Sequence, residues 1–190
     1  MEQGTSNISD EQQLAELCRS QDRLAQRRLY DEYAEYLALV AYRYIPVESD
    51  AKDVLMDALL NAYRNMNKFT WQGHGSLKAW LKKIVVNQCL MYLRRNNRPT
   101  LWIDNMVTEE PATDADALNR LSAKELIEMI HSLPDGYRTV FNLYVFEGMT
   151  HREIGKILGI SDNTSKSQLH KAKALLQENI KQVNKYRAHE

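Results

Sequence analysis

The amino-acid sequence predicts an all-α protein made of two small helical domains joined by a flexible acidic linker. Helix-breaking residues are scarce, with seven glycines and four prolines among 190 residues. Apolar residues recur at the three- and four-residue spacing of amphipathic helices through most of the chain. Residues with the spacing of helix caps precede several of these stretches. We therefore divide the chain into a disordered start (1–8), a first domain (9–97), a linker (98–120) and a second domain (121–190).

The first domain is expected to begin with a short helix, opened by a capping box of Ser9 and Gln12. A long helix over 22–45 follows, and Pro46 ends it because proline cannot donate the backbone hydrogen bond of a helix interior. The apolar residues of this helix predict its buried face: Leu24, Leu29, Tyr33, Tyr36, Leu37, Val40, Ala41 and Tyr44.

Two further helices complete the first domain. One spans about 50–67, with Ser49 or Asp50 as its N-cap. After a loop that contains glycine, helical spacing resumes over 77–96, either without a break or interrupted near Asn87.

The linker over 98–120 has no sustained hydrophobic period. Beyond it, Ser122 and Glu125 form a capping box that opens the first helix of the second domain. Pro134 takes the first position of the next helix, and Gly148 closes that helix.

Residues 150–173 predict a helix-turn-helix, the unit that places a helix in the major groove of DNA. Thr150 and Glu153 have the capping-box spacing of a short first helix. Gly155 lets a second helix approach closely, and Gly159 suits the left-handed residue that ends the first helix.

The second helix of this unit, capped by Ser161 or Asp162, carries side chains that reach phosphates and base edges. The alternative is an ordinary helical hairpin with a solvated basic face, but the glycines, the caps and the lysines together favour DNA binding. The residues predicted on the exposed face are Asn163, Thr164, Lys166, Ser167, His170, Lys171 and Lys173.

Charge is segregated along the chain, although the formal net charge is zero. Residues 1–63 hold twelve acids and six Lys or Arg, a net of −6. Residues 78–98 hold six Lys or Arg and no acid, and residues 99–121 hold five acids and one Arg. This distribution predicts different partners for different segments.

The cysteines and the hydropathy pattern predict a cytoplasmic protein with reduced thiols. Cys18 and Cys89 are isolated in apolar patterns without metal-ligand spacing, so we expect both to be buried. The polar, acidic start is unlike a secretory signal, and no apolar run approaches a membrane span. We expect no cofactor, no metal ion and no direct membrane insertion.

The stretch 69–98 mixes aromatic and basic residues, which suits single-stranded nucleic acid because cations follow the phosphates and rings stack on bases. Trp80 shares a helical face with apolar neighbours and is expected in the core. Phe69 and Trp71, beside the glycine loop, fit either a core role or a stacking role. Asn87 either caps a helix or reads a base edge.

Two groups of residues form a recognisable pattern. In the second domain they are Leu133-Pro134, Tyr137-Arg138, Val140-Phe141, Glu147-Gly148, Glu153-Ile154, Leu158-Gly159-Ile160-Ser161, Thr164, Lys166-Ser167, Leu169-His170 and Ala172. In the first domain they are Asp50-Ala51, Asp53-Val54, Ala79-Trp80-Leu81, Ile84, Asn87 and Tyr92-Leu93-Arg94-Arg95. In this order and joined by an acidic linker, they resemble bacterial RNA polymerase sigma factors of the extracytoplasmic-function (ECF) group.

The resemblance implies that the chain directs promoter-specific transcription initiation by core RNA polymerase. The helix 50–67 would bind the polymerase through Asp53, Asp57, Leu59, Leu60 and Tyr63. The minus-ten promoter element would be recognised and opened by Phe69, Trp71, Lys82, Lys83, Asn87, Gln88, Tyr92, Arg94 and Arg95, and Asn87 matches the position that helps hold a flipped base. The helix 162–176 would enter the major groove of the minus-thirty-five element.

The resemblance also implies protein partners and a place for the linker. The linker would lie in the RNA exit path of the polymerase, where its acids mimic nucleic acid. Such sigma factors are usually held silent by an anti-sigma protein, often membrane-anchored. The sequence shows no sensor of its own, so we expect such a partner.

The chain departs from the family pattern at five positions. Ser165 stands where an aliphatic core residue is usual, and Gln168 replaces an arginine. In the helix 50–67, Lys52 and Met56 replace an acid and a glutamine, and Tyr63 replaces a tryptophan. None of these breaks the fold pattern, but promoter preference does not carry over.

Two other classes of function compete with this interpretation. A two-domain regulator, with a helix-turn-helix and an N-terminal sensing or dimerisation domain, has no use for a second nucleic-acid surface at 69–98. An enzyme is disfavoured because the five histidines are scattered, without acids at metal-ligand or triad spacing. Asp53 and Asp57 fit a partner-facing stripe better than a metal pair, so we predict no catalytic residue.

Overall fold

The computed structural model describes residues 6–96 and 123–187, and all regular structure within these ranges is helical. The chain divides between Asn96 and Asn97 into two compact units. The predicted all-α class is confirmed. The linker 98–120, the disorder expected for residues 1–5 and the cap expected at Ser122 lie outside the described residues.

The N-terminal unit begins with α1 (Ser6–Arg19), so residues 6–8, which we expected to be disordered, are helical. The predicted cap at Ser9 is wrong because this residue lies inside α1. A tight turn follows, and Asp22 caps α2 (Arg23–Tyr44) by accepting a hydrogen bond from the amide of Ala25 at 2.8 Å. The long predicted helix is therefore confirmed to within one residue at each end.

The helix α2 ends before Pro46, which holds the preceding Ile45 in an extended conformation. The next helix, α3 (Glu48–Arg64), begins after Val47, which makes no side-chain cap. The predicted cap at Ser49 or Asp50 is therefore wrong, since both residues lie in the first turn. A short 3-10 helix, η1 (Met66–Lys68), leads into the glycine loop.

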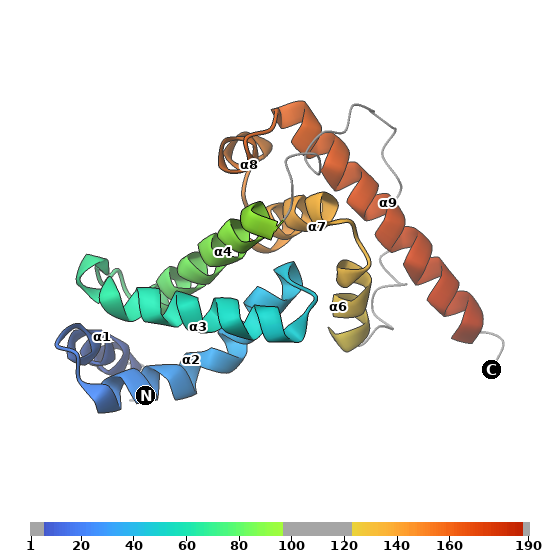
Figure 1. Cartoon of the computed structure of the whole chain (residues 1–190). Helices are drawn as coiled ribbons and strands as arrows, with labels where there is room; N and C mark the ends of the chain where they lie inside the picture. The colour runs from blue at the N-terminus through green and yellow to red at the C-terminus, as the bar shows by residue number, and fades with distance from the viewer. Residues whose placement is uncertain (1–5, 97–122, 188–190) are drawn as a thin grey trace. The chain divides into compact units, whose positions relative to one another are not determined.

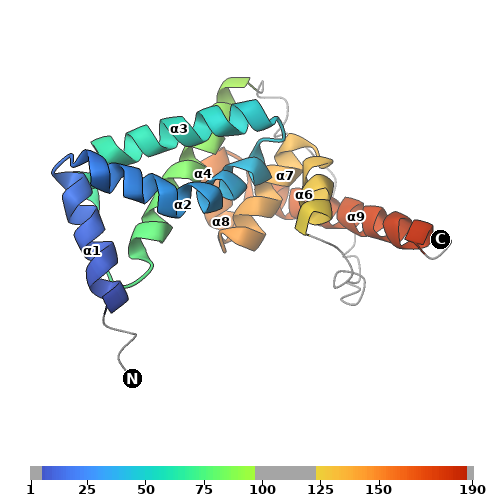
Figure 2. The same cartoon turned by 90° about the horizontal axis from the view of Figure 1, so that it is seen from below.

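The last helix of this unit, α4 (Ser76–Asn96), runs without a break through Asn87, so this residue caps no helix. The helices α2, α3 and α4 pack pairwise against one another, and α1 packs mainly on α2 (Figure 1 and Figure 2). The core between them is apolar and includes Leu29, Leu37, Tyr44, Leu59, Met66, Leu77, Leu81 and Val85.

The predicted burial holds for the cysteines and fails for one leucine. Cys18 and Cys89 are both buried free thiols, and burial raises the pKa of Cys18 to about 11. Leu24, which we expected to face the core, is 82% exposed at the start of α2. Helical spacing alone placed it wrongly, because no helix among the described residues covers Leu24 on the first turn of α2.

The C-terminal unit contains α6 (Ala123–His131), α7 (Asp135–Phe141), the π-helical turn η3 (Asn142–Phe146), α8 (His151–Leu158) and α9 (Asp162–Arg187). Both α7 and α8 pack against α9, and α6 contacts α9 farther along the chain, where the Asn179 amide donates to the Ser132 hydroxyl at 3.0 Å. Pro134 is the N-cap of α7, so its predicted place as the first helical residue is wrong by one position.

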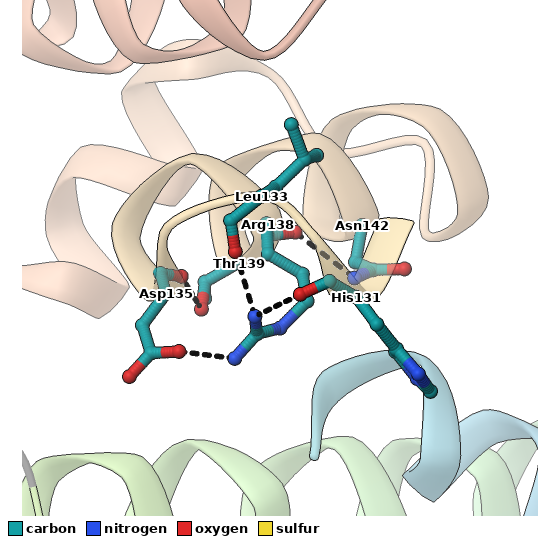
Figure 3. A network of polar contacts seen from close by, with 6 residues as sticks. All are labelled: His131, Leu133, Asp135, Arg138, Thr139 and Asn142. Atoms are coloured by element: carbon teal, nitrogen blue, oxygen red, sulfur yellow. Dashed lines mark hydrogen bonds and ion pairs between the residues drawn. The ribbon is translucent and has the colours of Figure 1, made fainter. Parts of the chain in front are cut away.

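A buried arginine fixes the corner between α6 and α7 (Figure 3). The guanidinium of Arg138, 3% exposed, donates to the carbonyl of Leu133 at 2.7 Å and to that of His131 at 3.3 Å. It also pairs with the carboxylate of Asp135. These bonds satisfy carbonyls at the end of α6 that have no partner within the helix. The sequence pattern contained Arg138 but assigned it no role.

Within residues 6–96 and 123–187, no helix has both the length and the apolar character needed to cross a membrane.

Candidate nucleic-acid interfaces

One exposed face of α4 carries a stripe of basic side chains with an amide and a methionine among them. Lys83, Asn87, Met91 and Arg94 follow one another at helical spacing, and all four are exposed. Arg95 is exposed beside them, and α4 carries no acidic residue. Met91 is absent from the predicted set, although its place four residues after Asn87 could have identified it. The stripe brings together the positive charge and the amide that a nucleic-acid contact requires.

Three of the predicted minus-ten residues lie elsewhere. Phe69 is buried, with its ring centroid 5.5 Å from that of Trp80, so the structure places it in the core and not as a stacking platform. Tyr92 is half-buried and donates its hydroxyl to the carboxylate of Asp50 on α3. Trp71 is half-buried in the loop before α4. The remaining two, Lys82 and Gln88, are half-buried on α4.

The helix α3 presents acids and apolar side chains together on its outer face. Asp53, Met56, Asp57 and Leu60 are exposed, and the exposed fractions of Met56 and Leu60 are 48% and 47%. Leu59 is 2% exposed and belongs to the core, which corrects its prediction as a contact residue.

The other predicted contact residue of this helix, Tyr63, is half-buried and ties α3 to α2. Its hydroxyl donates to the carbonyl of Gln26 at 2.9 Å. Burial raises the pKa of Tyr63 to about 12. Tyr63 is one of three departures from the family pattern on this helix. Of the other two, Lys52 forms an exposed ion pair with Glu48 at 2.6 Å, and Met56 adds apolar surface to the outer face.

The helix-turn-helix has the caps and turn that its sequence predicts. Thr150 and Glu153 form both halves of a capping box at the start of α8. Gly159 ends α8 in the left-handed region, with φ of 71°. A Cβ atom on Gly155 would lie 2.7 Å from the carbonyl oxygen of Ile160, so only glycine lets the turn approach α8 this closely. Ser161 caps α9 by accepting from the amide of Thr164 at 2.9 Å.

The predicted DNA-contacting face of α9 is exposed in part. Asn163, Lys166 and Lys173 are exposed, and Thr164, His170 and Lys171 are half-buried. Ser167 is 8% exposed, so its prediction as a surface residue is wrong. The positive end of Lys171 lies 6.0 Å from the centroid of the Tyr137 ring.

The two departures on α9 point inward. Ser165 is fully buried, and its hydroxyl shares a hydrogen bond of 2.9 Å with Nδ1 of His151 on α8. The ring of His151 also stacks on that of Tyr144, with a centroid distance of 4.8 Å. Gln168 is also fully buried, and its amide has no hydrogen-bond partner among the described residues.

The environment of His151 disfavours its charged form. Burial lowers the pKa of His151, and the positive charge of Lys166 lowers it further, while Asp162 opposes the shift. The residue therefore joins the two helices as a neutral side chain near pH 7.

Comparison with known proteins accounts for both units. The family Sigma-70 region 2 matches residues 29–99, and the family Sigma-70, region 4 matches residues 123–176. The ECF RNA polymerase sigma-E factor of Haemophilus influenzae is 26% identical over 182 residues, which cover 90% of this chain and 95% of that protein. The RNA polymerase sigma-H factor of Pseudomonas aeruginosa is 27% identical over 178 residues, which cover 86% of this chain and 90% of that protein.

The chain belongs to the ECF group of sigma factors. Its fold is similar to that of the sigma factor RpoE of Bartonella quintana, solved in complex with the anti-sigma factor NepR. The TM-score is 0.50 at 20% identity, and the match covers 82% of this chain and 96% of that chain. In the chain described here, the residues that match Sigma-70 region 2 include the α4 stripe. The residues that match Sigma-70, region 4 include the helix-turn-helix. The helix α1 precedes both matches.

Proposed function

We propose that this sigma factor binds core RNA polymerase and directs it to promoters, reading the minus-thirty-five element as duplex with α9 and opening the minus-ten element with α4. The observation that supports this division is the presence of a base-reading amide among cations on each unit. Asn87 lies between Lys83 and Arg94 on α4, and Asn163 lies three residues before Lys166 on α9. A regulator with a single operator-binding face, the alternative function, leaves the α4 stripe without a use.

The outer face of α3 is the surface we assign to core polymerase. It combines two carboxylates, Asp53 and Asp57, with the exposed side chain of Leu60. Apolar side chains within a charged rim are typical of protein interfaces, and acids at this position keep α3 from competing for DNA.

The energetics of strand opening explain why the sigma factor needs the polymerase. Opening DNA costs about 1.4 kcal/mol per stacked step. One captured base returns about 1–3 kcal/mol. A small domain that traps one or two bases therefore nucleates a bubble but does not sustain a full helical turn of open DNA, so we expect the free chain to bind promoters weakly.

An anti-sigma protein, a class that is often membrane-anchored, completes the proposal. It is supported by the resemblance in fold to a sigma factor whose structure was solved with an anti-sigma factor. Isolation of the chain from its own cells at low salt tests this partner directly. Recovery of polymerase subunits as the sole tight partners would contradict it.

Transcription with purified components tests the central proposal. We expect core polymerase together with this chain to start transcription at a specific promoter, while either alone does not. A matched pair of variants separates the surfaces: Asp57→Lys on α3 should reduce the affinity for core, and Lys181→Glu, far along α9, should not. Specific initiation at the same promoter by core polymerase without this chain would overturn the proposal.

A further inference from the structure

The loop between η1 and α4 is held at both ends by one helix that is remote in sequence. At its start, the guanidinium of Arg19 on α1 donates to the carbonyl of Phe69 at 3.1 Å. At its end, the carboxylate of Glu11, also on α1, accepts from the amide of Gly75 at 2.7 Å and from that of Leu77 at 2.9 Å. The two side chains thus fix Phe69, the residue before the segment 70–75, and Gly75, its last residue.

The Glu11 contacts are a helix cap supplied from another helix. Gly75 and Leu77 flank the first residue of α4, where the backbone amides lack partners within the helix. A carboxylate at such an end is favoured by the partial positive charge of the helix N-terminus. Glu11 is only 7% exposed, so the bond to Leu77 is buried and the bond to Gly75 is partly shielded from water.

Apart from the packing of Phe69 against Trp80 at its start, the loop has few other contacts of its own. The bonds within it are one from the amide of Gln72 to the Ser76 hydroxyl at 3.3 Å and one from the Ser76 amide to the carbonyl of Gly73 at 3.1 Å. Gly73 and Gly75 both have positive φ, at 109° and 83°. Glycine at these positions leaves the unfolded loop highly flexible, so ordering it depends on contacts from outside.

We propose that Glu11 and Arg19 are positioning residues for promoter opening: by fixing both ends of the loop 70–75, they set the place from which Trp71 and the α4 stripe meet the separated strands. This inference rests on the proposed function of α4. It assigns a role in opening to α1, which lies outside the region 2 match that begins at residue 29. Neither side chain needs to touch DNA for this role.

Three variants of the full chain separate positioning from general stability. Glu11→Gln keeps the shape but leaves one amide without an acceptor, because the side-chain NH₂ cannot accept. Glu16→Gln makes the same charge change at an exposed position of α1. Asp22→Ala removes the cap of α2, at the other end of α1, and lowers stability without touching the loop.

Hydrogen exchange of the free chain gives a readout that does not depend on polymerase. We expect Glu11→Gln to speed exchange of the amides of residues 72–77, while Glu16→Gln and Asp22→Ala leave them protected. Arg19→Ala, compared with Arg23→Ala at an exposed position, tests the other end of the loop.

Promoter opening by holoenzyme then tests the role. We expect Glu11→Gln to slow opening of duplex promoter roughly tenfold, equivalent to about 1.4 kcal/mol in the barrier. Affinity for core polymerase should stay unchanged, and a template mismatched at the minus-ten element should restore most of the rate. The Asp22→Ala control should open duplex promoter at the wild-type rate.

The outcomes are distinct. If wild-type holoenzyme fails to open any promoter, the proposed function fails, and the exchange data still report on the loop. If wild-type holoenzyme opens promoters and Glu11→Gln equals it, the positioning role is overturned, with or without faster exchange in the loop. If Glu11→Gln and Asp22→Ala slow promoter opening equally, the positioning role is likewise overturned, because a general loss of stability then explains both defects.

Discussion

Nδ1 of His151 and the hydroxyl of Ser165 share a hydrogen bond of 2.9 Å that joins the two helices of the helix-turn-helix. The family resemblance implies an aliphatic side chain at position 165. In this chain the contact between α8 and α9 is instead polar: the buried Ser165 meets the half-buried His151, whose ring stacks on that of Tyr144. Residue 165 is therefore still part of the core, but a hydrogen bond takes the place of the apolar packing that an aliphatic side chain would make.

Loss of the Ser165 hydroxyl should weaken this joint. We expect Ser165→Ala to destabilise the C-terminal unit by about 0.5–1.5 kcal/mol, the usual net value of one hydrogen bond. Amide exchange in α8 and α9 of the full chain measures the loss. In a His151→Ala background the same substitution should cost much less, and strictly additive losses would show that the two side chains are not coupled.

The stability of the same unit should depend on pH. Because the folded pKa of His151 is lowered, the unfolded chain takes up this proton first, at about pH 6.5, and the folded chain only at lower pH. Stability is therefore complete above pH 6.5 and falls as the pH drops toward the folded pKa, by at most about 1.4 kcal/mol per pH unit. Titration of the His151 ring proton by NMR measures the folded pKa, and a value above 6.5 would contradict the prediction.

A methyl group at Gly155 should disrupt the turn between α8 and α9. Its Cβ would meet the Ile160 carbonyl at 2.7 Å, so the backbone must move. We expect Gly155→Ala to cost about 1–3 kcal/mol, the range for overpacking. The neighbouring Lys156→Ala, at an exposed position, should stay within about 0.5 kcal/mol of wild type. Urea denaturation followed by far-UV circular dichroism measures the free energy of unfolding of both variants and distinguishes them.

The proposed base contact of Asn87 predicts a defect in opening alone. We expect Asn87→Ala to lower permanganate reactivity of minus-ten thymines, with a loss of about 1–3 kcal/mol in base discrimination. Because Asn87 is exposed on α4 and α3 carries the assigned polymerase face, affinity for core should be unchanged. Identical footprints in wild type and variant would remove Asn87 from the DNA contact.

Phosphate contacts by α9 should appear in the salt dependence of holoenzyme binding to closed promoter. Each duplex phosphate that is neutralised contributes about 0.9 to the slope of log affinity against log salt. We expect Lys166→Ala and Lys173→Ala each to reduce the slope by about this amount. Lys181→Ala, exposed farther along α9 and outside the region 4 match, is the matched control. A wild-type slope for Lys166→Ala would exclude that lysine.

Several predictions that rest on short spacing agree with the structure, although the caps predicted at Ser9 and at Ser49 or Asp50 do not. The helix expected over 22–45 is found at Arg23–Tyr44, and the capping box of Thr150 with Glu153 is present. These features join residues three or four apart, so local sequence contains nearly all the information that they need.

Predictions of which side chain faces outward are less reliable. Ser167 was placed on a surface and is buried, and Leu24 was placed in the core and is exposed. Leu59 and Phe69, which we named as contact residues, both lie in the core. A helical period defines faces relative to one another, but the neighbour that covers a face belongs to another part of the chain. The acids of α3 and most of the predicted cations of α4 are exposed as expected, and Lys82 is half-buried, because charged side chains are rarely buried without partners.

The sequence by itself determined the helices, the caps and glycines of the helix-turn-helix and the segregation of charge, because each depends on neighbours along the chain. Only the tertiary structure decided that Ser165 meets His151 and that α1 supplies both anchors of the loop before α4. Glu11 is separated from Gly75 by 64 residues and from Leu77 by 66. No periodicity links positions so distant, and their contact exists only because the packed helices bring them together.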